Sequence, residues 1–135
     1  PLALASLQAT IAPDVAYCVS VGNHHLIIPT TQVKLYPLST LAETITEQKY
    51  FPDGINISIF EETNGTISMR TYERGVGPTL GCGSAALSVF MLTHKHNGTK
   101  KATIQQPGGT VTLRIENQRI SMHANYQAVA SVTLC

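Results

Sequence analysis

The segment from Tyr72 to Ala86 constrains this chain more than any other. Within it, the charged pair Glu73-Arg74 and a glycine-rich turn lead into Cys82, and an apolar run that is compatible with a helix follows. A thiol at a helix N-terminus faces unpaired backbone N–H groups and the positive end of the helix dipole. Both effects favour the thiolate, so the segment predicts a reactive cysteine at position 82. The alternative is a packing cysteine, since free cysteines are often fully buried.

The composition limits the classes of partner. The chain has 135 residues, of which 43% are hydrophobic, and this is enough for one domain with a core. Charged residues make up only 13% and the net charge is +1, without a basic run, so we expect no nucleic-acid partner. No apolar segment approaches the roughly 18 residues of a spanning helix, so we expect no membrane partner. The three cysteines are widely spaced and show no metal-ligand spacing, which indicates no metal site and a reducing, cytoplasmic compartment.

Most of the chain predicts short strands, and two segments predict helices. Apolar residues at helical spacing predict a helix over residues 38–49, with Ser39 or Thr40 as its N-cap. A second helix is expected from Cys82 to about His96, because Gly98 is a typical stop. Strands are expected over residues 17–22, 26–29, 55–59, 67–71, 102–106, 110–115, 120–123 and 129–134.

The turns and the apolar residues complete the predicted fold. Asn64-Gly65 is a strong hairpin signal, and Pro107-Gly108-Gly109 predicts a tight hairpin and not a phosphate loop. Besides the isoleucines of the strands, we expect four residues in the core: Met69, Phe90, Met91 and Met122. We therefore predict an α+β fold with a curved, mostly antiparallel sheet wrapped around a central helix, plus one further short helix.

Polar groups that suit an amino-acid substrate surround the cysteine segment. Their side chains come from three separate segments: Asn23, Asn56 and the pair Glu73-Arg74. Arg74 and the backbone N–H groups of Gly83 and Ser84 suit a carboxylate, while Glu73 and the asparagine amides suit an ammonium group. A thiolate held near the α-carbon would then serve as a general base.

Several of these residues also have purely structural interpretations. Glu73-Arg74 has the pattern of an ordinary surface pair, and Asn56 alone could satisfy a turn. The adjacent histidines His24 and His25 lie in a strand, where neighbouring side chains point to opposite faces. We therefore expect one surface histidine and one that lines the site or is hydrogen-bonded, and not a metal-binding pair.

Four stretches of the chain form an ordered set of motifs. They are Gly22-Asn23-x-His25, Phe51-Pro52-x-Gly54-Ile55-Asn56-Ile57, Tyr72-Glu73-Arg74-Gly75-x-Gly77-x-Thr79-x-x-Cys82-Gly83-Ser84 and Gln106-Pro107-Gly108-Gly109. In this order they resemble the C-terminal half of the diaminopimelate epimerase family, from about Val19 to Met122. The cysteine segment is the most specific of the four.

The resemblance implies a cofactor-independent epimerase with two similar lobes, each a curved antiparallel sheet around a central helix. Two cysteines, one per lobe, face opposite sides of the substrate α-carbon, and the reaction interconverts L,L- and meso-diaminopimelate in lysine and cell-wall biosynthesis. Cys82 matches one of these acid/base thiols, and His25 matches the family histidine near the site. The positions that match substrate-binding groups are Asn23, Asn56, Glu73, Arg74, Gly83 and Ser84.

In the family, the other lobe carries the partner cysteine within a Cys-Gly-Asn-Gly type motif. This sequence contains no such motif. Cys18 lies in a β-rich strand and Cys135 is the last residue, so neither substitutes for that cysteine. We therefore expect residues 1–135 to be a single domain, the C-terminal lobe of a longer enzyme, inactive without its N-terminal lobe. A homodimer through the exposed inter-lobe face is also open.

Two of the departures from the family pattern lie in these motifs, and two alternative functions stay open. His24 stands where the family usually has Pro, and Pro78 stands where it usually has Glu. One alternative is a racemase or isomerase of the same superfamily that acts on another amino acid. The other is a non-catalytic binding module.

Overall fold

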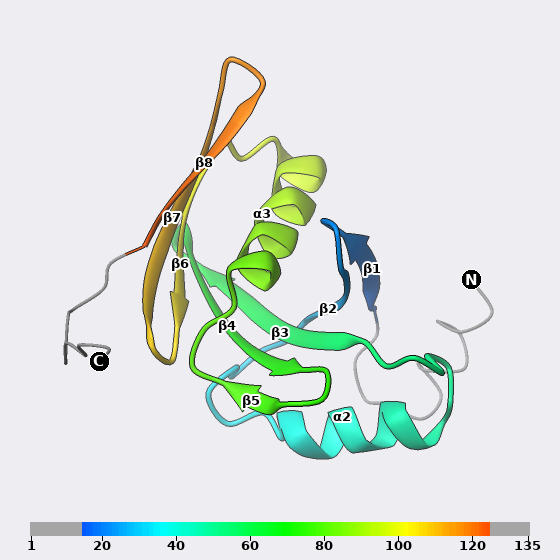
Figure 1. Cartoon of the computed structure of the whole chain (residues 1–135). Coiled ribbons are helices and arrows are strands. Elements are labelled where there is room, and N and C mark those ends of the chain that lie inside the picture. The colour runs from blue at the N-terminus through cyan, green and yellow to red at the C-terminus, as the bar shows by residue number, and fades with distance from the viewer. Residues whose placement is uncertain (1–14, 125–135) are drawn as a thin grey trace, which may run out of the picture.

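The computed structural model describes residues 15–124, which form one curved eight-stranded sheet and two helices (Figure 1). The strand order is β1-β2-β3-β4-β6-β7-β8, and β5 pairs with β4. The elements are β1 (Tyr17–Ser20), β2 (His24–Pro29), α2 (Leu38–Glu47), β3 (Asn56–Thr63), β4 (Thr66–Glu73), β5 (Gly77–Thr79), α3 (Gly83–Asn97), β6 (Lys101–Gln106), β7 (Gly109–Glu116) and β8 (Arg119–Ala124).

The sheet is mixed, with most pairings antiparallel. The β2–β3 and β4–β6 pairings are parallel because in each case the chain crosses over through a helix, α2 or α3, before it returns to the sheet. Helix α3 lies inside the curve of the sheet, and α2 lies against the opposite side of the central strands (Figure 1). The predicted curved sheet around a central helix, with a second and shorter helix, is confirmed.

The central strands are buried on both faces. In β2, Leu26, Ile27 and Ile28 are consecutive and fully buried. Leu26 and Ile28 pack in the core beneath α2, whereas Ile27 packs in the core around α3. A strand that is covered on both faces has a continuous apolar run instead of an alternating pattern. The two helices therefore each cover one face of the same strands.

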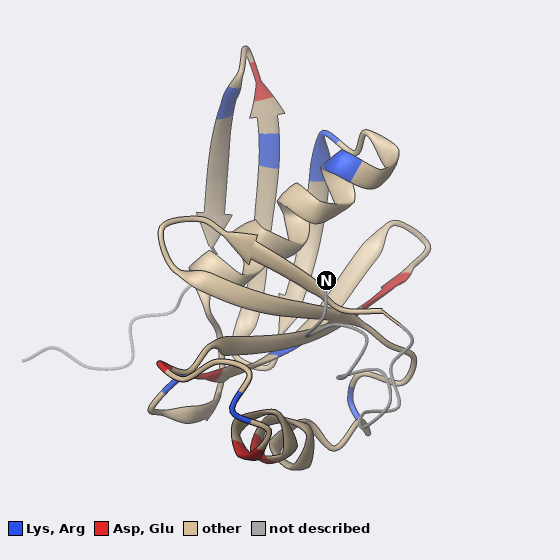
Figure 2. Cartoon of the chain, turned by 90° about the vertical axis from the view of Figure 1, so that its right-hand side faces the viewer, with Lys and Arg blue, Asp and Glu red and all other residues tan. Residues whose placement is uncertain are grey.

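Helix α3 follows the prediction closely. Cys82 is its N-cap, and Gly98 is its C-cap with a left-handed φ of 75°. The side chains of Ala85, Val89 and Phe90 are completely buried against the sheet. Basic residues in its last turn complement the negative end of the dipole, and Figure 2 shows the Lys and Arg colour at this end of the helix.

The hairpin at Asn64-Gly65 is confirmed, since it joins β3 to β4 and both residues have positive φ, 51° and 79°. Helix α2, by contrast, begins at Leu38 with Pro37 as its N-cap and without a side-chain cap, so the predicted cap was wrong. This helix is held by its buried face and not by a capping side chain.

Two core predictions are wrong, and one strand cannot be compared. Met91 is only partly buried and belongs to neither core cluster. Met122 is 39% exposed because β8 lies at the end of the strand order, where all six of its residues are exposed. The strand predicted over residues 129–134 lies outside the described residues. Within residues 15–124, neither helix is long and apolar enough to cross a membrane.

The loop between β2 and α2 is held by one cation. The Arg70 guanidinium donates two hydrogen bonds from Nη1, to the carbonyl oxygens of Val33 at 3.0 Å and Tyr36 at 2.7 Å. We predict that Arg70→Met lowers the free energy of unfolding by about 2 kcal/mol, because both carbonyls lose a charged donor. Urea unfolding measures this.

Arg114→Met is the matched control for this prediction. Arg114 is exposed on β7, and a surface substitution of this kind is expected to change the free energy of unfolding by less than about 0.5 kcal/mol. Equal losses in the two variants would contradict the anchoring role of Arg70.

Candidate active site

Strand alternation decides which polar side chains face the cysteine helix. In β2, Ile27 packs in the core around α3, and His25, two residues earlier, shares that face. In β4 the same alternation places Glu73 on the α3 side. His24 and Arg74 follow the opposite parity, and both line a cavity on the other side. The chain thus separates a thiol cluster from a cavity.

The hydroxyl of Ser84 is the centre of the thiol cluster. Its Oγ lies 3.4 Å from the Cys82 Sγ and 3.1 Å from Nε2 of His25, and the side-chain amide of Asn23 donates to it at 3.2 Å. Nε2 of His25 also lies 3.2 Å from Oδ1 of Asn23. One hydroxyl therefore connects the start of α3 with β2 and with the turn before it. The sequence predicted a role for the backbone of Ser84 and missed this role of its side chain.

The environment of Cys82 favours the neutral thiol. The residue is only 8% exposed, and this burial is the main cause that raises the pKa of its thiol. The Ser84 hydroxyl and the Ala85 amide lower the pKa, but a hydrogen bond and the charge of Glu73 raise it further. The position at the helix N-terminus is as predicted, but burial raises the pKa of the thiol more than the hydrogen bonds at the start of the helix lower it.

His25 is completely buried, and its burial lowers the pKa of the imidazole more than the charge of Glu73 raises it. Its Nδ1 has no hydrogen-bond partner among residues 15–124. The exposed His24 lies beside it on the other face of β2. The expectation of one surface histidine and one hydrogen-bonded histidine is confirmed.

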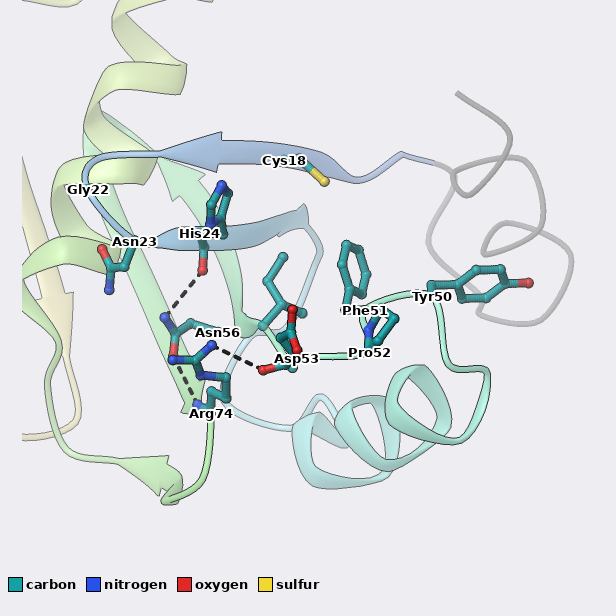
Figure 3. Close-up of a pocket in the computed structure, with 12 residues that line it drawn as sticks. Cys18, Gly22, Asn23, His24, Tyr50, Phe51, Pro52, Asp53, Asn56 and Arg74 are labelled. Carbon is teal, nitrogen blue, oxygen red and sulfur yellow. Dashed lines mark hydrogen bonds between the residues drawn. The ribbon is translucent and has the colours of Figure 1, made fainter.

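The cavity on the other side has a volume of about 620 Å³ and is lined by the three predicted residues Asn23, Asn56 and Arg74 (Figure 3). Oδ1 of Asn56 accepts a hydrogen bond from the backbone N–H of Arg74 at 2.9 Å, and its Nδ2 donates to the carbonyl of His24 at 3.2 Å. Nη1 of Arg74 donates to the carbonyl of Asp53 at 3.1 Å. Asn56 therefore joins the ends of two strands at the cavity wall.

A glycine at position 54 allows the Arg74 side chain to take this path. Gly54 has a φ of +78°, and a Cβ there would lie 2.7 Å from the Cγ and Cδ atoms of Arg74. Any other residue would have to move the stem of the arginine away from the cavity wall.

The structure thus places the predicted residues in two neighbouring groups. The residues of the thiol cluster are Cys82, Ser84, His25, Asn23 and Glu73, and those of the cavity are Asn23, Asn56 and Arg74. Asn23 belongs to both groups, and Gly83 is the first residue of α3. Among the described residues, no three His, Cys, Asp or Glu side chains are arranged to hold a metal ion.

One contact of the cysteine was not predicted as part of the site. Oε1 of Gln106 accepts a hydrogen bond from the backbone N–H of Cys82 at 2.8 Å. Gln106 belongs to the hairpin motif that was part of the resemblance, but its spacing alone carries no signal of this contact.

The fold is shared with proteins of known structure. A phenazine biosynthesis protein of the PhzF family from Enterococcus faecalis superposes with a TM-score of 0.55 at 12% identity, and covers 76% of this chain and 38% of its own. A putative PhzC/PhzF protein from Clostridium difficile gives a TM-score of 0.54 at 15% identity over the same shares. The chain therefore has the α+β fold of these proteins.

The family follows from the sequence comparison. The profile of diaminopimelate epimerase matches residues 17–129, and the chain belongs to this family. The diaminopimelate epimerase of Buchnera aphidicola subsp. Baizongia pistaciae is 45% identical over 75 residues, which are 55% of this chain and 26% of the relative. That of Halothermothrix orenii is 32% identical over 114 residues, which are 83% of this chain and 40% of the relative. The chain thus spans well under half the length of these relatives.

The influence of Glu73 on the thiol can be tested directly. We predict that Glu73→Gln lowers the pKa of Cys82, because it removes a negative charge that disfavours the thiolate. The pH dependence of Cys82 alkylation by iodoacetamide, followed by mass spectrometry of the peptide, should move to lower pH. Glu116→Gln, on the distant β7–β8 hairpin, should leave the profile unchanged. An unmoved profile in Glu73→Gln would contradict the contact.

The buried histidine predicts a pH dependence of stability. Folding lowers the pKa of His25, so near and below the ordinary histidine pKa of about 6.5 the unfolded state binds more protons than the folded state. The free energy of unfolding therefore decreases as the pH is lowered through this range. His25→Gln should therefore lose less free energy of unfolding than the parent between about pH 7 and about pH 5. His24→Gln should keep the full loss. Parallel slopes for all three proteins in urea unfolding would contradict this prediction.

Proposed function

We propose that this chain is the C-terminal lobe of a diaminopimelate epimerase and that Cys82 is one of its two acid/base thiols. The observation that carries the proposal is the place of Cys82 in a member of this family. The cysteine caps the N-terminus of α3, next to the Ser84 hydroxyl and the carboxylate of Glu73. A proton donor and acceptor is thus held beside an electropositive helix end.

The raised pKa of Cys82 suits both directions of proton transfer. The α-hydrogen of an amino acid is a very weak acid, so the base must be strong and the carbanion must be stabilised. At neutral pH Cys82 rests as the thiol, which donates its proton to the α-carbon in one direction of the reaction. In the other direction the thiolate, once formed in this buried place, is a stronger base than an exposed one.

The groups around the thiol and the cavity suit a substrate with an amino-acid group at each end. The N–H groups of Gly83 and Ser84 at the start of α3 suit the carboxylate at the reacting carbon. Asn23, Asn56 and Arg74 suit the distal amino-acid end, with Glu73 as a partner for an ammonium group. This two-part arrangement favours diaminopimelate over an amino acid with only one such end.

The second thiol belongs to the part of the enzyme that this chain does not contain. It must approach the α-carbon from the opposite face, and we propose that the N-terminal lobe supplies it. Closure of the two lobes would exclude water from the carbanion. We expect the enzyme to act in the cytoplasm and to need no cofactor, and the isolated lobe to be inactive.

Exchange of the substrate α-hydrogen with deuterated water tests this function. We predict that the full-length protein exchanges the α-hydrogen of L,L-diaminopimelate under reducing conditions. Cys82→Ser in the full-length protein should reduce exchange by at least about a hundredfold, because a positioned general base is lost. The 135-residue chain alone should show no exchange.

Lys95→Gln, at the other end of α3, is the control and should exchange like the parent. If the folded, reduced full-length protein shows no exchange with this substrate, the epimerase assignment is wrong. Exchange with a different amino acid would then favour another isomerase of the superfamily, and no exchange with any would favour a binding module.

A further inference from the structure

The turn that carries Cys82 is attached to a hairpin far along the chain. The carbonyl of Leu80 accepts a hydrogen bond from the N–H of Gly108 at 2.6 Å. Two residues later, the N–H of Cys82 donates to Oε1 of Gln106 at 2.8 Å. The N–H of Gly108 and the side chain of Gln106 both belong to the β6–β7 hairpin, in which Gln106 pairs with Gly109. The hairpin therefore contacts the turn on both sides of Gly81.

Close approach of the two backbones requires glycine in the hairpin. A Cβ at position 108 would lie 2.9 Å from both the Cβ and the carbonyl oxygen of Leu80. Real Cβ atoms do not approach backbone atoms so closely, and backbone atoms cannot move aside as a flexible side chain can. The hairpin is thus fitted to this turn and does more than reverse the chain direction.

The bond from Gln106 acts on the residue that carries the thiol. Cys82 is the N-cap of α3, and its Sγ lies 3.4 Å from the Ser84 hydroxyl. A hydrogen bond from its backbone N–H fixes the orientation of the peptide plane between Gly81 and Cys82, and this restricts where Cα, Cβ and hence Sγ can lie. An acceptor at 2.8 Å on this N–H therefore restrains the thiol relative to Ser84 and Glu73.

Gln105, the preceding residue, does not share this role. Its side chain is exposed, and its Oε1 accepts a hydrogen bond from the hydroxyl of Ser68 at 3.5 Å. Because neighbouring side chains of a strand point to opposite faces, only Gln106 reaches the cysteine turn. Two identical side chains on one strand thus provide a matched pair.

We propose that Gln106 is a positioning residue for Cys82, which holds the thiol at the helix N-terminus through the backbone N–H of the cysteine. The importance of this role for catalysis rests on the proposed function, whereas the contact itself does not. The effect on the thiol is therefore measurable in this chain without substrate.

The experiment compares Cys82 alkylation in the parent, Gln106→Met, Gln106→Glu and Gln105→Met. Each protein is treated with iodoacetamide over a range of pH, and the modified Cys82 peptide is quantified, with the Cys18 peptide as an internal reference. Circular dichroism and the melting temperature report whether each variant is folded.

Gln106→Met keeps the length of the side chain but removes the acceptor. We expect Cys82 to react at least about threefold faster at neutral pH, and its profile to move to lower pH, because a loosened turn exposes the thiol. Gln106→Glu keeps an acceptor and adds a negative charge, so its profile should move to higher pH. In Gln105→Met the profile of Cys82 should match the parent, and the Cys18 profile should be the same in all four proteins.

A Cys82 profile in folded Gln106→Met and Gln106→Glu that equals the parent's would overturn the proposal. The same holds if Gln105→Met shifts the profile as much as Gln106→Met does. If Gln106→Met does not fold, Gln106→Ala, which also removes the acceptor, takes its place in this comparison.

Deuterium exchange by the full-length protein separates this proposal from the proposed function. Gln106→Met should lower the exchange rate by on the order of tenfold to a hundredfold, as expected for a misplaced catalytic group. Shifted alkylation in an enzyme without exchange would retain the positioning role and reject the function. Exchange that depends on Cys82, together with unshifted alkylation, would do the reverse.

Discussion

Burial of the central strands on both faces is the constraint on which the rest of the structure depends. The apolar run of β2 has to be covered by two helices, so α2 and α3 must pack on opposite faces of the same strands. Once these faces are fixed, the alternation of side chains leaves little freedom to the polar residues at the strand ends. His25 and Glu73 lie on the α3 face with the cysteine, while His24 and Arg74 lie at the cavity. The site is in this sense a consequence of the packing of the core.

The thiol illustrates how two effects of one position compete. The helix N-terminus stabilises negative charge, but the same packing that places Cys82 there removes it from water. Desolvation prevails, and the pKa of the thiol rises above its ordinary value. A buried thiol that keeps its proton until a substrate arrives is also protected against oxidation and alkylation, which require the thiolate.

The sequence predicted the features that depend on neighbours along the chain. The helix over α3, its N-cap at Cys82 and the Asn64-Gly65 hairpin all follow from local patterns, and the structure has them. The parallel pairings, the Ser84 hydroxyl as the centre of the thiol cluster and the bond from Gln106 depend on which distant strands meet. No local sequence pattern specifies which distant strands pair or which distant side chains are in contact. The burial that raises the pKa of Cys82 is likewise a property of the packed chain.

The hydrogen bonds at Ser84 have a consequence for the order in which the chain folds. They join Ser84 to His25 and Asn23 across 59 and 61 positions of the chain, whereas the β3–β4 and β6–β7 hairpins close over two residues. Contacts between distant residues require the closure of long loops, which costs more conformational entropy and delays their formation. The thiol cluster is thus expected to assemble after the hairpins on the folding pathway. A partly folded chain would have its hairpins but no site.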